Sequence, residues 1–361
     1  MASKAARRVF FSKPLEILLL VIFFLSFNIY ILSLFEVKLE PKEKVGQISE
    51  LPCPPAPTAV TVTSNFEEQI EQDGQIITFE EDGRFGNLLM ETATLILIGQ
   101  NHNVPVNILP RVGAKLSKYL SPLPAPVVDH TKHCICTYCT DCLCPTCQKW
   151  TKVASWTYMK SPATYDQKYV LLKWFNSDLV LGHLGKMRSL FKPLLQPTTI
   201  TEIQTFFHEL QAKRGKALSF VSIHVRRTDY VQWIEKRYKG HVVDHRFFKH
   251  CMDTFRTENP DTVFIVTSDD ISWCRENLKG DDVIFPEINH GESDPIVTDF
   301  ILLTQTNHSI YDYGSFGFWG AALAGGRTMV ADGYSDKIHP ILAAIRKAKP
   351  ENWTRVDVSK L

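Results

Sequence analysis

Hydrophobic and polar positions divide the chain into three parts. Leu15–Phe35 is almost wholly apolar, carries Glu16 as its only charged residue, and is about as long as a helix that crosses a bilayer. Residues 36–75 are rich in Lys, Glu, Pro, Thr and Ser and hold few large apolar side chains. From residue 76 onward, short apolar runs alternate with amphipathic stretches. The pattern predicts a cytoplasmic tail at 1–14, a transmembrane signal anchor at 15–35, a stem at 36–75 and a folded body.

Charges around the apolar segment predict its orientation. Basic residues precede it, whereas lysines and acids are mixed after it, which favours a cytoplasmic amino terminus and a lumenal body. A cleaved signal peptide and a buried core helix are the alternatives. Against them, the run exceeds a typical signal h-region, no A-x-A-like cleavage site follows, and no polar face is present. Sequons at Asn307 and Asn352 are predicted glycosylation sites that agree with a lumenal compartment, although the motif around Asn307 could exclude a glycan sterically.

The body alternates between strand and helix patterns. In residues 76–215 the pattern is less regular and predicts the following elements: a strand at Ile76–Phe79, a tight turn at Gly83–Gly86, a helix at Leu88–Asn101, an apolar run near Val104–Leu109, a strand at Tyr169–Leu172 and a helix at Thr199–Lys213.

Residues 216–361 are more regular. Their predicted strands are Phe220–Val225, Val263–Thr267, Val283–Phe285, Ser309–Tyr311 and Thr328–Val330, and their predicted helices are Asp244–Phe255, Ser272–Leu278, Ile296–Thr304 and Ser315–Leu323. This alternation is typical of a parallel, doubly wound sheet, in which ligands bind beyond the carboxyl ends of the strands. We therefore expect an α/β fold with two Rossmann-like domains facing a cleft, an amino-terminal domain at 76–215 and a carboxy-terminal domain at 216–361.

Composition narrows the class of partner. Of 361 residues, 44% are hydrophobic, and the formal net charge is +1. These values argue against a disordered chain and against a partner recognised mainly through charge, such as nucleic acid.

Six of the nine cysteines crowd into one segment, between Cys134 and Cys147. Their C-x-C and C-x-x-C spacing suits a zinc site in a reducing compartment, but in an oxidising lumen the same density favours a disulfide-stapled loop. Because the count is odd, at least one thiol is free or pairs elsewhere. We predict a cysteine-rich insertion at 130–150 that lies apart from the catalytic centre.

The run SIHVRRTDY, Ser222–Tyr230, places candidate chemistry directly after a buried-type strand. Arginines at a strand's carboxyl end face the ligand crevice, and their planar forks bind phosphate oxygens in pairs. The alternative is an ion-paired surface turn of arginine and aspartate.

Two further motifs lie later in the chain. YGSFGFWG, Tyr313–Gly320, combines glycines with a helix start, whose N–H groups, aided by the Ser315 hydroxyl, suit a phosphate; the alternative is glycine used for helix packing. Asp299, at the start of the run DFILL, can accept two hydrogen bonds from guanine or simply favour a helix amino terminus.

An early motif, GRFGNLLMETATL at Gly83–Leu95, predicts a strand-turn-helix with Arg84 and Asn87 at its tip. Glycine there permits close approach by a ligand from the facing domain. An ordinary turn before an amphipathic helix is the alternative.

Taken in order, these runs resemble the galactoside α-1,2-fucosyltransferase family, whose members carry a GRxGN...E.ATL start and an HVRRGDY run. Further matches are SDDISWCRENL, DFILLTQTNHSI and GSFGFWGAALAGG, and coverage extends from about residue 76 to the carboxyl terminus, interrupted by the cysteine-rich insertion. The resemblance implies a GT-B-like pair of domains, GDP-fucose as donor, a galactose-terminated glycan as acceptor, α-1,2 linkage with inversion, no cofactor or divalent metal, and a type II Golgi membrane protein.

The resemblance also implies roles for the motif residues. Arg226 would bind the diphosphate with support from His224 and Arg227, and Asp299 would read guanine. The phosphate end of the donor site would be lined by Ser315, Phe316 and Gly317, and the acceptor side would include Arg84 and Asn87. Asp229 is a candidate catalytic base together with Arg226 in the catalytic set; alternatively, it orients Arg227.

The chain departs from the family pattern at two positions. Thr228 stands where the usual α-1,2 member has glycine, and HVRRTD also occurs in core α-1,6-fucosyltransferases. Thr306 stands where cysteine is common. Another linkage of the α-1,6 type, an inactive lumenal glycan-binding relative and a metal-bound regulatory protein built around the cysteines are the alternative functions.

Overall fold

The computed structural model describes residues 76–128, 151–162, 169–288 and 294–361. The predicted tail, anchor, stem and cysteine-rich insertion lie outside these ranges. Within them, no helix is both long and apolar enough to cross a membrane.

The first sheet contains three parallel strands in the order β1-β3-β2. Every residue of β1 is buried, because helix α2 packs against it with a face of Leu, Ile, Met and Ala side chains. The elements of this part are β1 (Ile76–Phe79), α2 (Phe85–His102), α3 (Pro110–Leu116), β2 (Thr151–Ala154), α4 (Ser155–Lys160), β3 (Tyr169–Lys173), α5 (Ser177–Gly182), α6 (Leu184–Phe191) and η3 (Lys192–Leu194).

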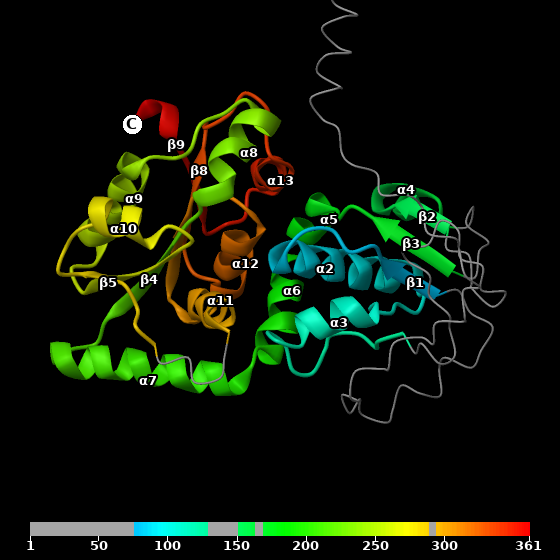
Figure 1. The fold of residues 1–361 in the computed structure, drawn as a ribbon, viewed down its shortest axis with the longest axis horizontal. Helices are drawn as coiled ribbons and strands as arrows, with labels where there is room; N and C mark the ends of the chain where they lie inside the picture. Colours follow the sequence, from blue (N-terminus) through cyan, green and yellow to red (C-terminus); the bar gives the residue numbers. More distant parts are fainter. Residues whose placement is uncertain (1–75, 129–150, 163–168, 289–293) are drawn as a thin grey trace, which may run out of the picture. The chain divides into compact units, whose positions relative to one another are not determined.

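The second sheet has six parallel strands in the order β6-β5-β4-β7-β8-β9 (Figure 1). The chain enters it through α7 (Pro197–Arg214), which ends at Gly215 in the left-handed conformation. The elements that follow are β4 (Ser219–Val225), α8 (Thr228–Tyr238), α9 (His245–Glu258), β5 (Thr262–Ser268), α10 (Ile271–Asn277), β6 (Val283–Ile284), α11 (Pro295–Gln305), β7 (His308–Tyr311), α12 (Ser315–Ala324), β8 (Thr328–Asp332), α13 (Pro340–Ala348), β9 (Trp353–Asp357) and η4 (Val358–Lys360).

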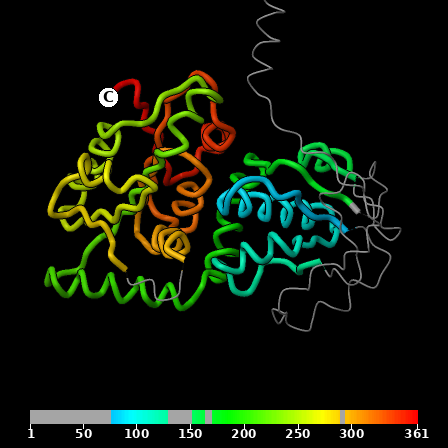
Figure 2. The backbone as a smooth tube through the Cα atoms, viewed as in Figure 1, coloured from blue at the N-terminus to red at the C-terminus, as the bar shows by residue number. Residues whose placement is uncertain are grey.

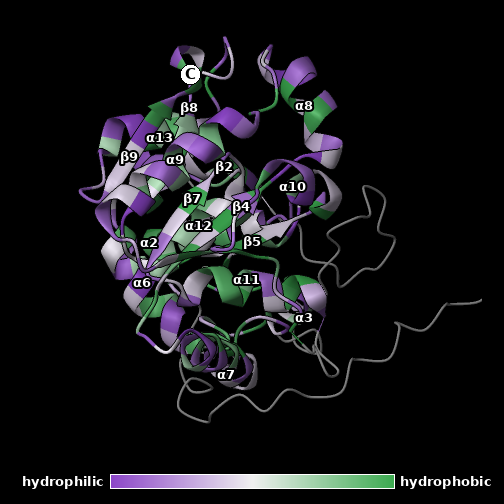
Figure 3. Ribbon diagram, turned by 90° about the vertical axis from the view of Figure 1, so that its left-hand side faces the viewer, coloured by the Kyte–Doolittle hydropathy of each residue, from purple (hydrophilic) through white to green (hydrophobic). Residues whose placement is uncertain are grey.

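Helices cover both faces of the second sheet, so its central strands β5, β4, β7 and β8 are almost wholly buried. Val221 and Ile223 of β4 belong to the hydrophobic cluster that includes Phe247 and Phe248 of α9. Phe220 belongs to the other cluster, with Phe300 of α11 and Trp319 of α12. Figure 3 shows α11 coloured mainly hydrophobic, whereas α7 carries many hydrophilic residues. Because strand side chains alternate, His224 shares the α11/α12 face with Phe220.

Helices from the first part of the chain pack directly on those of the second. The Phe85 ring at the start of α2 stacks on Tyr119 with centroids 3.5 Å apart and meets Phe300 edge-on at 4.6 Å. The Arg188 Nε of α6 donates to the carbonyl of Ala322 in α12 at 2.7 Å. The backbone trace in Figure 2 follows the passage between the two parts along α7. One hydrophobic cluster therefore draws on both sheets, and the domain boundary at 215/216 stays a prediction.

The predicted α/β class is confirmed, and so are two parallel sheets. The predicted strands and helices lie within two or three residues of the observed ones, with two kinds of difference. The run near Val104–Leu109 forms only isolated bridges, Ile77 to Val106 and Ile108 to Val127. Some elements were not predicted, namely α8, α13, β2 and β9 together with the short helices α3 to α6.

Candidate active site

Arg226 lies at the carboxyl end of β4, where three acidic side chains surround it. Its guanidinium pairs with Asp269, the residue after β5, and with Asp229 in the first turn of α8. Its backbone N–H donates to Oδ2 of Asp312, the residue after β7, at 2.8 Å. Because β5, β4 and β7 are neighbours, their carboxyl ends bring these residues together. The Arg226 side chain is 15% exposed, so it is a partly buried cation whose charge is paired with carboxylates.

Arg227 points to a different set of partners. Its guanidinium lies 4.1 Å from the Trp273 ring centroid, and its Nε is 3.5 Å from Oδ2 of Asp270. Its backbone N–H donates to Oδ1 of Asp269 at 2.8 Å. The hypothesis that Asp229 orients Arg227 is therefore wrong: Asp229 contacts Arg226 instead, because α8 begins at Thr228 and turns its first carboxylate toward the preceding strand end.

Arg84 joins the same cluster from the first part of the chain. Its Nη2 lies 3.0 Å from Oδ2 of Asp229. Both side chains are well exposed, at 79% and 54%, so the pair contributes little to stability, about 0–1 kcal/mol. Its significance is positional, since it places the tip of the GRFGN motif beside Arg226.

The amino-terminal ends of α2 and α12 touch. The Ser315 hydroxyl donates to Oδ1 of Asn87 at 2.7 Å, across 228 residues of sequence. A methyl group on Gly86 would lie 2.7 Å from the Phe316 backbone nitrogen and from Ser315 Oγ, so this approach requires glycine. Gly314, the N-cap of α12, has a φ of 88°, which also favours glycine.

The first N–H groups of α12 are available to a ligand. The helix has no side-chain cap, and its first internal hydrogen bond runs from the Phe318 N–H to the Gly314 carbonyl at 3.2 Å. The N–H groups before Phe318 are the donors that such a helix start presents to an anion. Ser315 and Phe316 carry two of them, as the sequence predicts. The Ser315 hydroxyl donates its hydrogen to Asn87. In this arrangement it can only accept a hydrogen bond and therefore cannot donate one to a phosphate.

His224 and Gly317 form a packed layer beneath this helix start. His224 is only 7% exposed, and its ring lies 5.2 Å from that of Phe316. A methyl group on Gly317 would lie 2.8 Å from His224 Nδ1 and 2.9 Å from the Tyr311 ring. Burial lowers the pKa of His224 to about 4, so the ring is neutral at pH 7 and adds no positive charge for a diphosphate. Gly317 thus serves close packing of helix on strand, the alternative considered for this glycine.

Asp299 lies one turn inside α11. The N-cap of that helix is Asp294, whose Oδ1 accepts the Ile296 N–H at 3.0 Å. Capping is therefore not the role of Asp299, contrary to that alternative. Burial raises the pKa of Asp299 to about 6, and no residue in the described part of the chain donates a hydrogen bond to its carboxylate. The next residue, Phe300, meets Phe316 edge-on at 5.3 Å, which ties this part of α11 to the start of α12.

Asp269 and Asp312 are site residues that the sequence analysis missed. Asp312 is 1% exposed and accepts N–H groups from Arg226 and, at 2.7 Å, from Tyr313. Its burial nevertheless raises its pKa well above the ordinary value. Asp269 binds both the Arg226 guanidinium and the Arg227 N–H. Asp312 directly follows a predicted strand, as Arg226 does, and Asp269 lies two residues after another, so these positions were the available signal.

The remaining sequence predictions concern glycans, thiols and metals. Asn352 is exposed, and Asn307 accepts the Phe220 N–H at 2.8 Å through its side-chain oxygen, so glycan attachment stays a prediction at both. Cys251 and Cys274 are buried free thiols. The clustered cysteines lie outside the described ranges. Among the residues inside those ranges, no three His, Cys, Asp or Glu side chains are grouped to hold a metal ion.

The parallel sheets, with an arginine and a helix start at the carboxyl ends of adjacent strands, define an α/β protein whose ligand site lies at that edge. The model of glycosyl transferase family 11 matches residues 194–357. Galactoside alpha-(1,2)-fucosyltransferase 1 of Leontopithecus chrysomelas is 31% identical over 298 residues, which cover 80% of this chain and 73% of the relative. The protein of the same name from Alouatta caraya is 32% identical over 288 residues, 77% of this chain and 70% of the relative. The chain belongs to glycosyl transferase family 11, which confirms the resemblance seen in the sequence.

The solved structures that align with this chain share much less sequence with it. A mutant of Arabidopsis thaliana FUT1 in complex with GDP has a TM-score of 0.45 at 12% identity, covering 73% of this chain and 72% of that one. POFUT1 in complex with GDP has a TM-score of 0.45 at 11% identity, covering 72% and 98%.

Proposed function

We propose that this chain is an inverting fucosyltransferase that moves L-fucose from GDP-fucose to the 2-hydroxyl of a galactose on a glycan. Family membership and the names of its relatives support the proposal. The observation that carries it is the position of Arg226, a partly buried cation at the carboxyl ends of β4, β5 and β7. A GT-B-like arrangement, with the donor on the second sheet and the acceptor toward Arg84 and Asn87, completes it.

Donor binding would exchange the partners of Arg226. Asp229 and Asp269 neutralise its guanidinium in this structure, and a diphosphate also offers pairs of oxygens to a guanidinium, with more charge. The N–H groups at the start of α12 would meet further phosphate oxygens. Asp299 would accept the two donors of the guanine edge, since none of the residues that the structure describes donates a hydrogen bond to its carboxylate.

The chemistry follows from that placement. When the bond between fucose C1 and the phosphate oxygen breaks, its electron pair goes to GDP, and the arginine and N–H groups stabilise that developing charge. The galactose 2-hydroxyl attacks C1 from the opposite face, and its proton passes to a base. Asp229 is the candidate base, because diphosphate binding at Arg226 would release one of its two guanidinium partners. With these donors, the mechanism needs no divalent metal or cofactor.

The cellular setting is also a proposal. The apolar segment 15–35, the stem and the two sequons support a type II Golgi membrane protein with a lumenal body that carries glycans at Asn307 and Asn352. Exposure of Asn352 supports attachment there.

The test incubates the full-length protein in detergent with GDP-fucose and a glycan array, with and without EDTA, and then determines the linkage of any product. We expect α-1,2-fucosylated galactose in both arms. An α-1,6 product would overturn the linkage, and loss of activity with EDTA would overturn metal independence. Binding of GDP without transfer would identify an inactive relative, and absence of GDP affinity by calorimetry would overturn the assignment altogether.

A further inference from the structure

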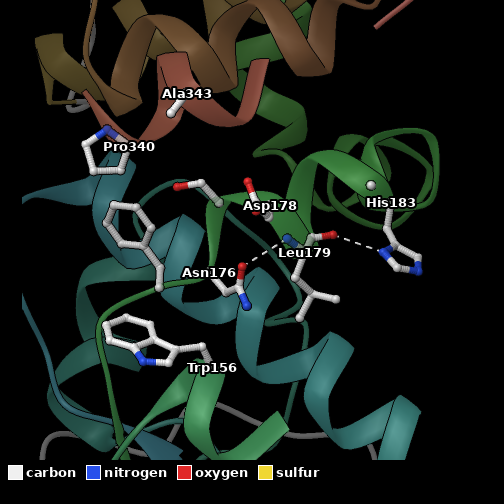
Figure 4. Close-up of a pocket in the computed structure, with 10 residues that line it drawn as sticks. Trp156, Asn176, Asp178, Leu179, His183, Pro340 and Ala343 are labelled. Atoms are coloured by element: carbon white, nitrogen blue, oxygen red, sulfur yellow. Dashed lines mark hydrogen bonds between the residues drawn. The ribbon is translucent and has the colours of Figure 1, made fainter. Parts of the chain in front are cut away.

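A cavity of about 670 Å³ lies at the carboxyl edge of the first sheet. It is lined by Trp156 of α4, by the segment that follows β3, including Phe175 and Asn176, and by Pro340 at the start of α13. Figure 4 shows the Trp156 indole and Pro340 toward one side of this pocket and His183 toward the other. The volume is in the range of pockets that hold small ligands.

Two indoles are exposed at this edge. Trp156 follows β2 and Trp174 follows β3, and their rings stack with centroids 5.4 Å apart and planes 11° from parallel. Trp156 is 45% and Trp174 is 54% exposed, the most exposed tryptophans among the described residues. Exposed indole surface is unfavourable in free energy compared with buried indole surface. A ligand that covered the two rings would remove this cost.

The backbone holds Trp174 in this position against its local preference. Its φ is 56°, in the left-handed region that large residues rarely adopt. The hydroxyl of Ser155, itself fully buried, donates to the Trp174 carbonyl at 2.6 Å. Two residues on, the Asn176 N–H donates to Thr94 Oγ1 of α2 at 3.0 Å. Strain maintained by buried hydrogen bonds is typical of ligand sites.

The polar groups of the pocket suit hydroxyls and not phosphates. Asn176 Oδ1 accepts the Leu179 N–H, which leaves the amide NH₂ as a donor. His183 Nδ1 lies 2.9 Å from the Leu179 carbonyl, so that nitrogen donates a hydrogen bond to the carbonyl and Nε2 is left for a hydroxyl. Asp178 pairs with Lys347 and is the only acidic side chain that lines the cavity, while no Lys or Arg lines it. A neutral ligand fits this lining, and an anion does not.

We infer that this pocket binds the acceptor, a neutral glycan ending in galactose, with a sugar ring packed on the Trp156 indole. Trp174 does not line the pocket but stacks on Trp156 and supports it. One face of galactopyranose carries a patch of C–H bonds, which complements the negative face of an indole. Donors and acceptors of Asn176 and His183 would bind its hydroxyls. The inference rests on the proposed function and adds to it the residues that select the acceptor.

The pocket lies at the same sheet edge as the link to Arg226. The three strands of the first sheet run parallel, so the residues that follow β1, β2 and β3 gather at one edge. Arg84 follows β1 and pairs with Asp229. An acceptor held on Trp156 after β2, which Trp174 after β3 supports, therefore occupies the edge that leads to the candidate base.

The experiment compares Trp156→Ala and Trp174→Ala in the full-length protein, with Phe206→Ala as the control. Phe206 is a half-buried aromatic of α7 that lines neither the pocket nor the Arg226 cluster. We expect each tryptophan variant to raise the acceptor KM about tenfold, as truncation of a stacking aromatic commonly does, while GDP affinity by calorimetry stays within about twofold. The control should leave both values unchanged.

Lactose binding, measured by saturation-transfer NMR without donor, separates this inference from the proposed function. Loss of the lactose signal in folded Trp156→Ala supports the pocket even if the wild-type protein transfers nothing. An unchanged acceptor KM and an unchanged lactose signal in both tryptophan variants would overturn the inference while leaving GDP binding and transfer intact. Thermal unfolding monitors the fold of each variant, and Trp156→Phe serves as the milder substitution if Trp156→Ala unfolds.

Discussion

The Nη2 atom of Arg84 lies 3.0 Å from Oδ2 of Asp229, although 145 residues separate them in the chain. Asp229 in turn pairs with Arg226, so one carboxylate joins the early GRFGN motif to the arginine after β4. Two of the motifs singled out in the sequence thus meet in one cluster. Its charges are balanced without a ligand, so ligand binding must rearrange them.

Arg226→Ala should lower kcat/KM for transfer by about 10²–10³-fold, because it removes the main cation expected to stabilise the leaving diphosphate. GDP affinity measured by calorimetry should fall as well. Arg246→Ala is the matched control, since Arg246 forms an exposed pair with Asp244 on α9. Full activity of folded Arg226→Ala would refute the assigned role.

Asp229→Asn should separate two roles of this carboxylate. If Asp229 accepts the proton of the acceptor hydroxyl, kcat falls while GDP affinity holds or rises, because Arg226 loses a competing partner. Steady-state kinetics and GDP calorimetry on the same preparation measure both quantities. Unchanged kcat would remove Asp229 from the catalytic set. Asp244→Asn, which alters an exposed carboxylate of α9, is the control.

GDP affinity should depend on pH through Asp299. Burial raises its pKa to about 6, and only the ionised carboxylate accepts both guanine donors. Affinity is therefore expected to be maximal above pH 6 and to fall by up to about tenfold per pH unit below it. Calorimetry between pH 5 and 8 gives the profile. Asp299→Asn should bind GDP weakly and lack this dependence; the same slope in that variant would assign it to another group.

Gly86→Ala should weaken the contact between α2 and α12. The added methyl would lie 2.7 Å from the Phe316 nitrogen and Ser315 Oγ, a clash expected to cost about 1–3 kcal/mol of unfolding free energy. Gly185→Ala on α6 meets nothing within 4 Å and should be neutral or stabilising by up to about 1 kcal/mol. Urea unfolding compares the two variants. Equal stability of both would show that the helix starts adjust freely.

The four central strands of the second sheet were predictable because they are buried on both faces, so their sequences are nearly continuous apolar runs. β4, β5, β7 and β8 all follow this pattern. Helix α8 was missed because its apolar stripe is narrow: Tyr230, Ile234 and Tyr238 recur every four residues, but only Ile234 is fully buried. β9 was missed because only Val356 in it is buried.

By itself, the sequence determined the α/β class, the family, and the position of Arg226 at a strand's carboxyl end, since each depends on local runs of residues. Tertiary structure alone decided the partners: Asp229 with Arg84, Asn87 with Ser315, and Trp156 with Trp174. These contacts join residues from different elements, and neither residue of a pair carries a local signal of the other. Parallel strands end at a common edge, and that geometry, which no periodicity in the chain records, brings the site together.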